Sequence, residues 1–447
     1  MEKLIINKTF LLNAFFYVVS LFCLTFLRKS LLIIYPIFVL SLFYLLNLKF
    51  TLRQISFSLI FLSVSAASAI IEGFINLNYF ISTFLILPIF LFLTSRYRRS
   101  SNVIKTKHFK SFFKKFTYLL IFVNVTALIY SQFFISSNQN YEDAFTGVYG
   151  GSGFGAHTLS IINFLVCVYF FFTKSYLKFL FFLVSGILGF YGLGLIIFIL
   201  AFSTTFIYKM RKYWRTALKV IFSVIIIGYS IFIFNPKNFT YINKNINYAK
   251  ESLVNYNYSN QMDKANNMQI TRIPRFITFV VGSIKLVSDD FKVLLLGTSP
   301  GGYNSRTAFL FNGDFMSNKF LKENFNNRTV YHSERVFPLL NRTYLKRPYN
   351  DGTRNQTFSS IISVLVEYGV LIGGILIFWF FSKARNIVKV SKTANPNLSQ
   401  YANFLSIFLF ILFLFQNYLE YPEIMLPAII ILKLIEIDSL NEPLHDS

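Results

Sequence analysis

The amino-acid sequence predicts an all-α polytopic membrane protein with about 12 transmembrane helices and one large, partly helical extracytoplasmic loop. Composition is the first reason: 54% of the 447 residues are hydrophobic and only 14% are charged, whereas soluble domains carry about 25% charged residues. The second reason is that apolar runs recur along most of the chain, each long enough to cross a bilayer. The third is the contrast between these runs and the mostly polar stretch at 235–357.

The first predicted span begins near the N-terminus and is interpreted as an uncleaved helix. Lys3 and Lys8 precede it, no small-residue cleavage site is present, and a second span follows at once. These features distinguish it from a removed signal peptide. In chain order, the apolar runs predict spans at 9–27, 31–47, 55–71, 79–94, 116–135, 157–173, 179–190, 192–207, 217–234, 358–382, 402–418 and 424–437.

Residues 179–207 form one apolar run, which is long for a single helix and is interrupted by glycines. Basic residues flank the run on both sides, including Lys178 before it and Lys209 after it. By the positive-inside rule, both flanks belong in the cytoplasm. A hairpin of two short helices that turns near Tyr191 satisfies this rule, whereas a single long helix does not.

Twelve spans place both termini in the cytoplasm, together with the basic segments 96–115 and 383–392. Arg28 and Lys29 then lie outside, against the rule, in a very short turn. Because long loops are largely exempt from the rule, the basic charge of the loop at 235–357 does not contradict an outside position.

The same topology places two shorter segments outside, at 135–156 and 420–423. The predicted organisation is therefore an N-terminal transmembrane bundle of about nine helices, the large extracytoplasmic loop, and about three C-terminal transmembrane helices. These three parts comprise residues 1–234, 235–357 and 358–447, respectively.

Several classes of function are excluded by the sequence. The net charge of +24 lies in short clusters between membrane spans, which is typical of loops beside anionic lipid and does not indicate nucleic-acid binding. Cys23 and Cys167 fall inside predicted spans, so we expect no disulfide and no metal site. His108, His332 and His445 are scattered. The chain lacks a P-loop, a nucleophile elbow and an HExxH motif, and no cofactor is expected.

The large loop contains about twice as many Lys and Arg as Asp and Glu residues, which favours an anionic partner such as a phosphate. An amphipathic helix is expected at about 272–288, with Pro274 in its first turn and its end at 288–290. A short apolar stretch then leads into the glycine-rich turn 297–302. The apolar face of the helix, expected to lie on the membrane surface, comprises Phe276, Phe279, Val280, Ile284 and Val287.

Arginine and glycine residues of this loop are the first candidates for a binding site. Arg272 and Arg275 start the expected helix, and an arginine fork binds two phosphate oxygens while remaining charged. Gly297, Gly301 and Gly302 would let the backbone approach a ligand closely. The alternatives are that the arginines face solvent or lipid head groups and that the turn is only a connector.

Polar residues at the boundaries of two spans are further candidates. Arg354 and Asn355 directly precede the span at 358–382, where a lipid-linked phosphate would lie, although they could instead be an interfacial anchor. Glu367 lies within that span, where a charged group usually faces a cavity or a partner, and a loop arginine is the expected partner. His157 follows the glycine-rich stretch 147–155, which either lines an outside-facing cavity or forms a flexible turn.

Four short motifs accompany this topology: TGVYG at 146–150, LGTSPGGY at 296–303, RNQTF at 354–358 and EYGVLIG at 367–373. With Arg275 ahead of the second motif, the chain resembles the bacterial O-antigen polymerase and ligase superfamily of membrane glycosyltransferases. That superfamily has about a dozen spans and one large outside loop between late helices. The topological resemblance covers nearly the whole chain, and the motif resemblance covers about 275–373.

The resemblance implies a GT-C-like fold in the bacterial cytoplasmic (inner) membrane and metal-independent glycosyl transfer at its outer face. The donor would be an oligosaccharide on polyprenyl diphosphate, and the acceptor another lipid-linked repeat unit. The pathway would be O-antigen (lipopolysaccharide), capsule or exopolysaccharide biosynthesis. Membrane lipids are the other expected partners, and a chain-length regulator and a flippase are compatible with the resemblance.

The resemblance also implies roles for the candidate residues. Arg275 would hold the diphosphate, Arg354 would share that task or position the acceptor, and Glu367 would orient one of these arginines. The substrate-binding residues would be Arg272, Gly297, Gly301, Gly302, Asn355 and His157.

Two departures from the superfamily pattern bear on the mechanism. Arg354 stands where ligases have a histidine, which disfavours a histidine-based ligase mechanism. The helical hairpin turns on residues 189–192 (GFYG), where many relatives have a Ser-Arg pair.

Other functions stay open at this point. An O-antigen ligase would move finished glycan onto a different acceptor. A flippase for lipid-linked sugars, or another transporter, should carry charged residues deep in several spans and have two related halves. The predicted spans are nearly free of charge and the halves look dissimilar, because only one contains a large loop. A membrane scaffold without enzymatic activity is the remaining alternative.

Overall fold

The computed structural model describes ten segments of the chain, together with five isolated residues at 222, 229, 247, 250 and 254. The predicted span at 217–234 and much of the predicted outside loop lie outside these segments. The described segments are 2–72, 77–98, 107–133, 144–151, 153–189, 192–207, 256–269, 273–310, 329–340 and 358–441.

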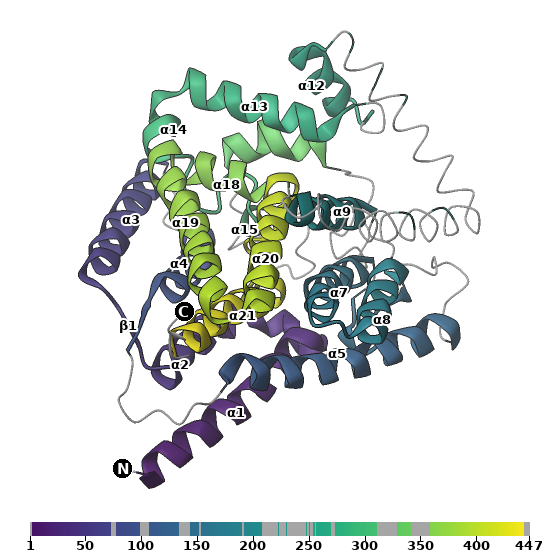
Figure 1. Ribbon diagram of the computed structural model, residues 1–447. Helices are drawn as coiled ribbons and strands as arrows, with labels where there is room; N and C mark the ends of the chain where they lie inside the picture. The colour runs from purple at the N-terminus through teal and green to yellow at the C-terminus, as the bar shows by residue number, and fades with distance from the viewer. Residues whose placement is uncertain are drawn as a thin grey trace.

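The described N-terminal part is helical, with one very small antiparallel ladder between β1 and β2 (Figure 1). Its elements are α1 (Glu2–Leu24), the 3-10 turn η1 (Phe26–Ser30), α2 (Leu31–Leu45), β1 (Leu48–Lys49), α3 (Leu52–Ile71), α4 (Leu77–Thr94), β2 (Arg96–Tyr97), α5 (His108–Phe133), the 3-10 turn η2 (Gly147–Tyr149), α7 (Gly153–Phe172), α8 (Tyr176–Leu188) and α9 (Gly192–Ile207).

The C-terminal part begins with short helices and ends with three long ones. Its elements are α12 (Tyr258–Asn266), α13 (Arg275–Asp289), α14 (Phe291–Leu296), α15 (Arg306–Leu310), the π-helical turn η4 (His332–Val336), the 3-10 turn η5 (Phe337–Leu339), α18 (Ser360–Glu367), α19 (Val370–Ala394), α20 (Pro396–Phe415) and α21 (Pro422–Asn441).

Six of the described helical segments are long and apolar enough to cross a membrane, and four shorter apolar helices accompany them. The outer face of α2 carries large apolar side chains, with Ile33 80% exposed and Ile37 61% exposed, as lipid contact requires. The prediction of an all-α membrane protein is therefore confirmed, while the number of twelve spans stays a prediction. The six segments are Phe26–Leu45, Leu52–Ile71, His108–Phe133, Gly155–Phe172, Val370–Ala394 and Pro396–Phe415.

Helix α21 lies in the interior of the bundle, because every residue from Pro422 to Ser439 is buried. It packs against α1, α4, α5 and α19. A helix that is apolar on all sides is stable only when other helices enclose it. This helix also carries charged residues near both ends. Their partners come from neighbouring segments and, for Lys433 and Glu436, from the helix itself.

One predicted span differs from the structure in its detail, and one predicted pair of short helices agrees with it. The single span expected at 358–382 is two helices, because the chain breaks at Tyr368 and Gly369, and Gly369 has a φ of +77° that favours glycine. The two short helices expected at 179–207 are present as α8 and α9. Helix α8 packs on α7, whereas α9 packs on α20 and α7.

The segments expected to form the outside loop build a small apolar core of their own over α18. In Figure 1, α13 and α12 lie across the top of the molecule, above α18. Phe279 and Leu286 of α13 are buried in this core, whereas Ile284, expected on the apolar face, is 63% exposed. The buried face of α13 therefore packs on protein, against α12, α14, α18 and η4.

Helices α1 and α21 run between two polar ends of the bundle. At one end, Arg28, just beyond α1, forms an ion pair with Glu423 in the first turn of α21. At the other end, Lys8 of α1 donates a hydrogen bond to Asn47 beside β1. Asp438 of α21 accepts hydrogen bonds there from the first backbone N–H groups of α5. We call the first the Arg28 end. We call the second the clip end, after the small β1–β2 ladder, which we call the clip.

Candidate functional site

The carboxylate of Glu367 binds the backbone of the glycine-rich turn. Its Oε2 accepts a hydrogen bond from the Gly301 N–H at 2.8 Å. Its Oε1 accepts from the N–H groups of Tyr303, Asn304 and Ser305 at 3.0, 2.9 and 2.9 Å. The sequence predicts an arginine partner for Glu367. That expectation is corrected by these contacts: convergent backbone N–H groups form an anion-binding concavity, and here the carboxylate occupies it.

Glycines allow this turn to reach α18 and α4. Gly297 has a φ of +80°, and a Cβ there would lie 2.3 Å from the carbonyl oxygen of Glu367. Gly301 has a φ of +75°, and a Cβ there would lie 2.8 Å from the carbonyl oxygen of Asn78. Any other residue would therefore be strained and would clash. The glycines expected to approach a ligand instead approach the protein's own backbone.

The third glycine of the turn, Gly302, is held from the loop side. Its carbonyl oxygen accepts a hydrogen bond from the hydroxyl of Thr329, and the same hydroxyl oxygen accepts a bond from the His332 N–H at 3.0 Å. The Nδ1 atom of the buried His332 lies 2.6 Å from the carbonyl oxygen of Tyr303. Two side chains therefore fix the turn: Glu367, which belongs to α18, and His332, which belongs to the loop.

A second buried carboxylate, Glu420, lies in the turn between α20 and α21. Its oxygens accept hydrogen bonds from the Ser82 hydroxyl at 3.0 Å and from the Arg306 N–H. Burial, and then the charge of Glu367, raise the pKa of Glu420 from 4.5 to about 8, against the opposing effect of these hydrogen bonds and of the Arg306 charge. Glu367 and Glu420 are thus coupled acids that lie on either side of the start of α15.

The raised pKa of Glu420 predicts a loss of stability as pH rises. The folded state retains a proton on Glu420 that the unfolded state has released, so the free energy of unfolding falls between about pH 4.5 and pH 8. The slope from one such group is about 1.4 kcal/mol per pH unit. Glu420→Gln should remove this contribution. Thermal unfolding of detergent-solubilised wild type and variant from pH 5 to pH 9 checks it, and parallel curves would contradict it.

A third carboxylate, Glu423, lies between two arginines. Its Oε1 is 3.5 Å from the Arg28 NH1, and its Oε2 is 3.5 Å from the Arg306 NH1. The Glu423 side chain is 1% exposed, while those of Arg28 and Arg306 are 6% and 16% exposed. Each guanidinium also stacks on an aromatic ring, Arg28 on Tyr149 at 4.4 Å and Arg306 on Tyr421 at 4.1 Å. Such stacking holds a guanidinium in place and leaves its edge free for anions.

The glycine-rich segment before α7 wraps around Arg28. Arg28 donates from Nε to the Tyr149 carbonyl at 3.3 Å and from NH2 to the Gly150 carbonyl at 2.9 Å. A Cβ on Gly155 would lie 3.3 Å from the same NH2 and 2.3 Å from the Gly150 carbonyl oxygen. The structure therefore brings this segment, expected as an early outside loop, to the same site as 301–306 and 420–423. His157 follows two residues later, half-buried in the first turns of α7.

Arg275 is the first residue of α13, and its NH1 donates to the Leu339 carbonyl at 3.3 Å. The adjacent Phe276 contacts Phe415, at the end of α20, with ring centroids 5.6 Å apart. The turn 416–421 follows α20, and Arg306 contacts it near its other end, at Glu420. Arg306 itself therefore contacts this turn, while at the start of α13 it is Phe276, next to Arg275, that contacts the end of α20. Arg272, Arg354 and Asn355 lie outside the described residues.

The sequence analysis does not select Arg28, Arg306, Glu420 or Glu423 as site residues. One signal was present: Arg28 breaks the positive-inside rule in the predicted topology, and a charge on the wrong side needs a partner. The two glutamates of the short turn 420–423 are the matching signal of opposite sign. Sequence separation of nearly 400 residues hides the pairing.

The Arg28 end thus combines fixed guanidinium groups, coupled carboxylates and a rigid backbone turn. Guanidinium groups can stabilise negative charge that develops on a leaving group, and a protonated Glu420 can hold or release one proton. Within the described residues, no group of three or more His, Cys, Asp or Glu side chains could hold a metal ion. No protein-family model matches the chain, and no curated protein matches it.

Proposed function

We propose that this protein polymerises polyprenyl-diphosphate-linked oligosaccharide repeat units at the outer face of the cytoplasmic membrane. The observation that carries the proposal is the convergence of Arg28, Arg306 and the turn 416–421 at one end of a bundle of apolar helices. Four segments expected on the outside meet there, which is where the diphosphate head of a membrane-embedded lipid would lie. Arg275 is the first residue of α13, and the next residue, Phe276, contacts Phe415 at the end of α20, just before this turn.

The chemistry requires a site that stabilises departing diphosphate. A hydroxyl oxygen of the acceptor sugar attacks the anomeric carbon of the donor, the bond from that carbon to the diphosphate oxygen breaks, and the hydroxyl proton leaves to a base or to water. Negative charge grows on the diphosphate, and fixed guanidinium groups stabilise it best where water is excluded. Arg306 and Arg275 are the groups proposed for this role.

Glu423 is proposed to serve as the resident counter-ion of this site. At 3.5 Å, its contacts with Arg28 and Arg306 are longer than the 2.7–2.9 Å of a tight charge-assisted bond. A diphosphate, with more charge and more acceptor oxygens than one carboxylate, would compete for the same N–H groups. Arg306 is the better placed to exchange partners, because it is the more exposed of the two arginines.

The test is the length profile of surface glycan in a deletion strain that carries wild type, Arg275→Ala, Arg306→Ala or the control Lys285→Ala. Lys285 is an exposed cation on the same helix as Arg275. We expect wild type and Lys285→Ala to restore a ladder of lengths, and the two arginine variants to leave single repeats at normal protein level.

Three outcomes would reject the proposal. A complete ladder in the deletion strain would exclude a polymerase. Full-length polymer that stays on the lipid carrier would indicate a ligase instead. Single repeat units that accumulate on the cytoplasmic side would indicate a transporter.

A further inference from the structure

A two-stranded clip at the end of the bundle opposite Arg28 places like charges side by side. Strand β1 pairs with β2 in antiparallel register, with Leu48 opposite Tyr97 and Lys49 opposite Arg96. Lys49 and Arg96 are both exposed, whereas Leu48 is buried. Directly opposite residues of a ladder lie on the same face, and like charges there are destabilising. An anion bound between the two cations would turn this destabilising repulsion into a stabilising attraction.

Two more exposed cations flank this pair. Arg98 continues β2, and its N–H donates to the Asn47 carbonyl at 3.3 Å. Arg53 is the second residue of α3, the helix that follows β1 in the chain. Both side chains are exposed. The clip therefore presents Lys49, Arg53, Arg96 and Arg98 within two short stretches of chain.

The acidic side chains described at this end are already engaged elsewhere. Glu436 binds Lys433 at 2.9 Å and also pairs with Lys383, so two cations share one anion. Asp438 accepts from the N–H groups of His108 and Phe109 at 3.1 and 3.0 Å. Within the described residues, no acidic side chain is in contact with the four clip cations. The clip end therefore carries an excess of positive charge.

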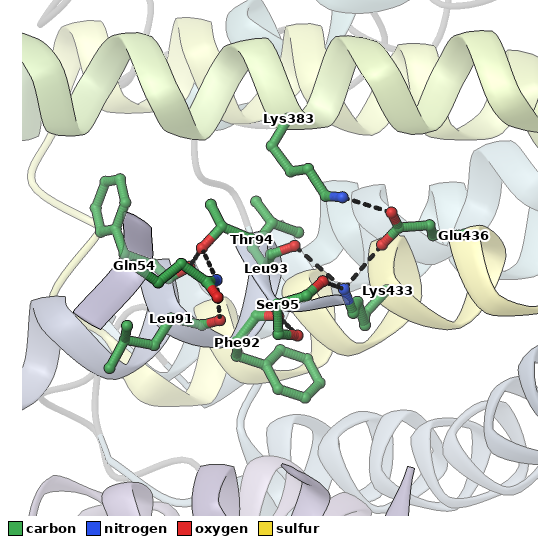
Figure 2. Close-up of polar contacts among 10 residues, drawn as sticks. Gln54, Leu91, Phe92, Leu93, Thr94, Ser95, Lys383, Lys433 and Glu436 are labelled. Atoms are coloured by element: carbon green, nitrogen blue, oxygen red, sulfur yellow. Dashed lines mark hydrogen bonds and ion pairs between the residues drawn. The ribbon is translucent and has the colours of Figure 1, made fainter. Parts of the chain in front are cut away.

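Buried polar side chains connect the segments at the base of the clip, and Figure 2 shows the contacts of Gln54 and Lys433. Gln54 of α3 donates to the Thr94 hydroxyl of α4 at 2.7 Å and accepts from the Thr51 N–H at 2.7 Å. The ammonium of Lys433 donates to the carbonyls of Leu93 and Ser95, at the end of α4. Gln54 and Lys433 are 1% and 0% exposed. Arg96 follows Ser95 directly, so the hydrogen bond to the Ser95 carbonyl fixes the backbone next to Arg96.

Apolar side chains surround the clip cations. Phe50 is 44% exposed and stacks on the buried Phe43 at 4.4 Å, and Leu52 is 83% exposed. Phe50 and Leu52 both lie between Lys49 and Arg53 in the sequence. Exposed apolar residues next to cationic ones suit the boundary between hydrocarbon and head groups. Free phosphate would gain nothing from Phe50 and Leu52.

We propose that the clip is a binding site for the phosphate head group of an anionic phospholipid. The phosphate lies between Lys49 and Arg96, with Arg53 and Arg98 beside it, and the acyl chains lie along Phe50 and Leu52. The site is separate from the Arg28 end and does not depend on the proposed function. It anchors the ends of α2, α3 and α4 to one leaflet.

Native mass spectrometry of the purified full-length protein, titrated with phosphatidylglycerol or phosphatidylcholine, tests this site. The clip variant carries Lys49→Gln, Arg53→Gln, Arg96→Gln and Arg98→Gln. The matched control removes the same charge from exposed residues of α5 and α19, through Lys110→Gln, Lys114→Gln, Lys389→Gln and Lys392→Gln. We expect wild type and control to bind phosphatidylglycerol in preference to phosphatidylcholine. The clip variant should bind phosphatidylglycerol at least about tenfold more weakly than wild type does.

A conservative variant guards against a folding defect. Lys49→Arg with Arg96→Lys keeps all charges and should retain the lipid, and every variant must elute as a single species on size exclusion. Equal loss of lipid in the clip variant and in the control would show that net charge alone attracts lipid, which overturns the proposal. Displacement of phosphatidylglycerol by 10-fold excess inorganic phosphate would overturn it too, because the apolar residues would then contribute nothing.

Discussion

Glu367→Ala is expected to abolish both the fold of the glycine-rich turn and activity. The change leaves the backbone N–H groups of Gly301, Tyr303, Asn304 and Ser305 buried without an acceptor. Each buried donor left unpaired costs about 1–3 kcal/mol, so the total loss is on the order of 4 kcal/mol or more. That is a large part of the stability of most proteins.

The conservative change Glu367→Gln should have a smaller effect, for a geometric reason. One carboxylate oxygen accepts three of the four bonds and the other accepts only the bond from Gly301. A glutamine oxygen can keep the three, while its NH₂ group faces Gly301 as a second donor. We therefore expect Gln to retain most of the stability that Ala loses.

Thermal unfolding monitored by size exclusion, with the glycan profile measured in parallel, checks the Glu367 series. The control is Glu334→Ala, which removes an exposed acid of the loop. The expected order of unfolding temperatures is wild type and Glu334→Ala highest, Glu367→Gln next and Glu367→Ala lowest. An Ala variant as stable as wild type would reject the role assigned to this carboxylate.

The ion pair between Arg28 and Glu423 is expected to give the second large effect. Arg28→Gln leaves Glu423 buried with one partner fewer and removes two hydrogen bonds to the 147–150 segment. Breaking a buried pair by removal of one partner costs about 3–5 kcal/mol. Glu423→Gln should cost a similar amount, because it leaves Arg28 and Arg306 without their shared anion.

A double-mutant cycle separates the pair from other effects. If Arg28 and Glu423 act on each other, the double variant should lose clearly less stability than the sum of the two single losses. Lys29→Gln is the matched control, since Lys29 is the exposed neighbour of Arg28 and carries the same charge. Strict additivity in the cycle, or an equal loss from Lys29→Gln, would reject the coupling.

Hydrogen bonds and ion pairs connect these residues into one network. Glu367 holds the turn, the turn delivers Arg306, and Arg306 reaches Glu420 and Glu423. Arg28 then continues the network from Glu423 to the 147–150 segment. A change at Glu367 should therefore displace Arg306 from Tyr421 and Glu423, so that stability and glycan length respond together.

Local sequence patterns were sufficient to predict the helices and some of the residues at which they end. The apolar runs correctly predict membrane helices, and the glycines near Tyr191 indicate that 179–207 is two helices. Within the expected amphipathic segment, α13 ends at Asp289, and the Asp290 side chain then accepts from the backbone N–H groups of Lys292 and Val293 at the start of α14. These signals are local because helix ends need partners within one turn.

The partners of the buried charges could not be predicted in the same way. Glu367 was expected to meet an arginine, because opposite charge is the obvious partner for a carboxylate at that depth. Backbone N–H groups compete equally well when a turn aligns several of them, and a sequence does not reveal which N–H groups a turn leaves free. The break at Gly369 was missed for a related reason: a glycine in an apolar run is compatible with a continuous helix.

Composition and periodicity by themselves determined that this chain is a bundle of membrane helices with polar segments between them, because burial of apolar surface depends mainly on which residues are present and at what spacing. Only the tertiary structure decided that Arg28, Arg306, Glu420 and Glu423 meet. A charge in an apolar bundle takes whichever partner the packing of helices brings within a few ångströms. That choice depends on contacts between residues hundreds of positions apart, and no local pattern records it.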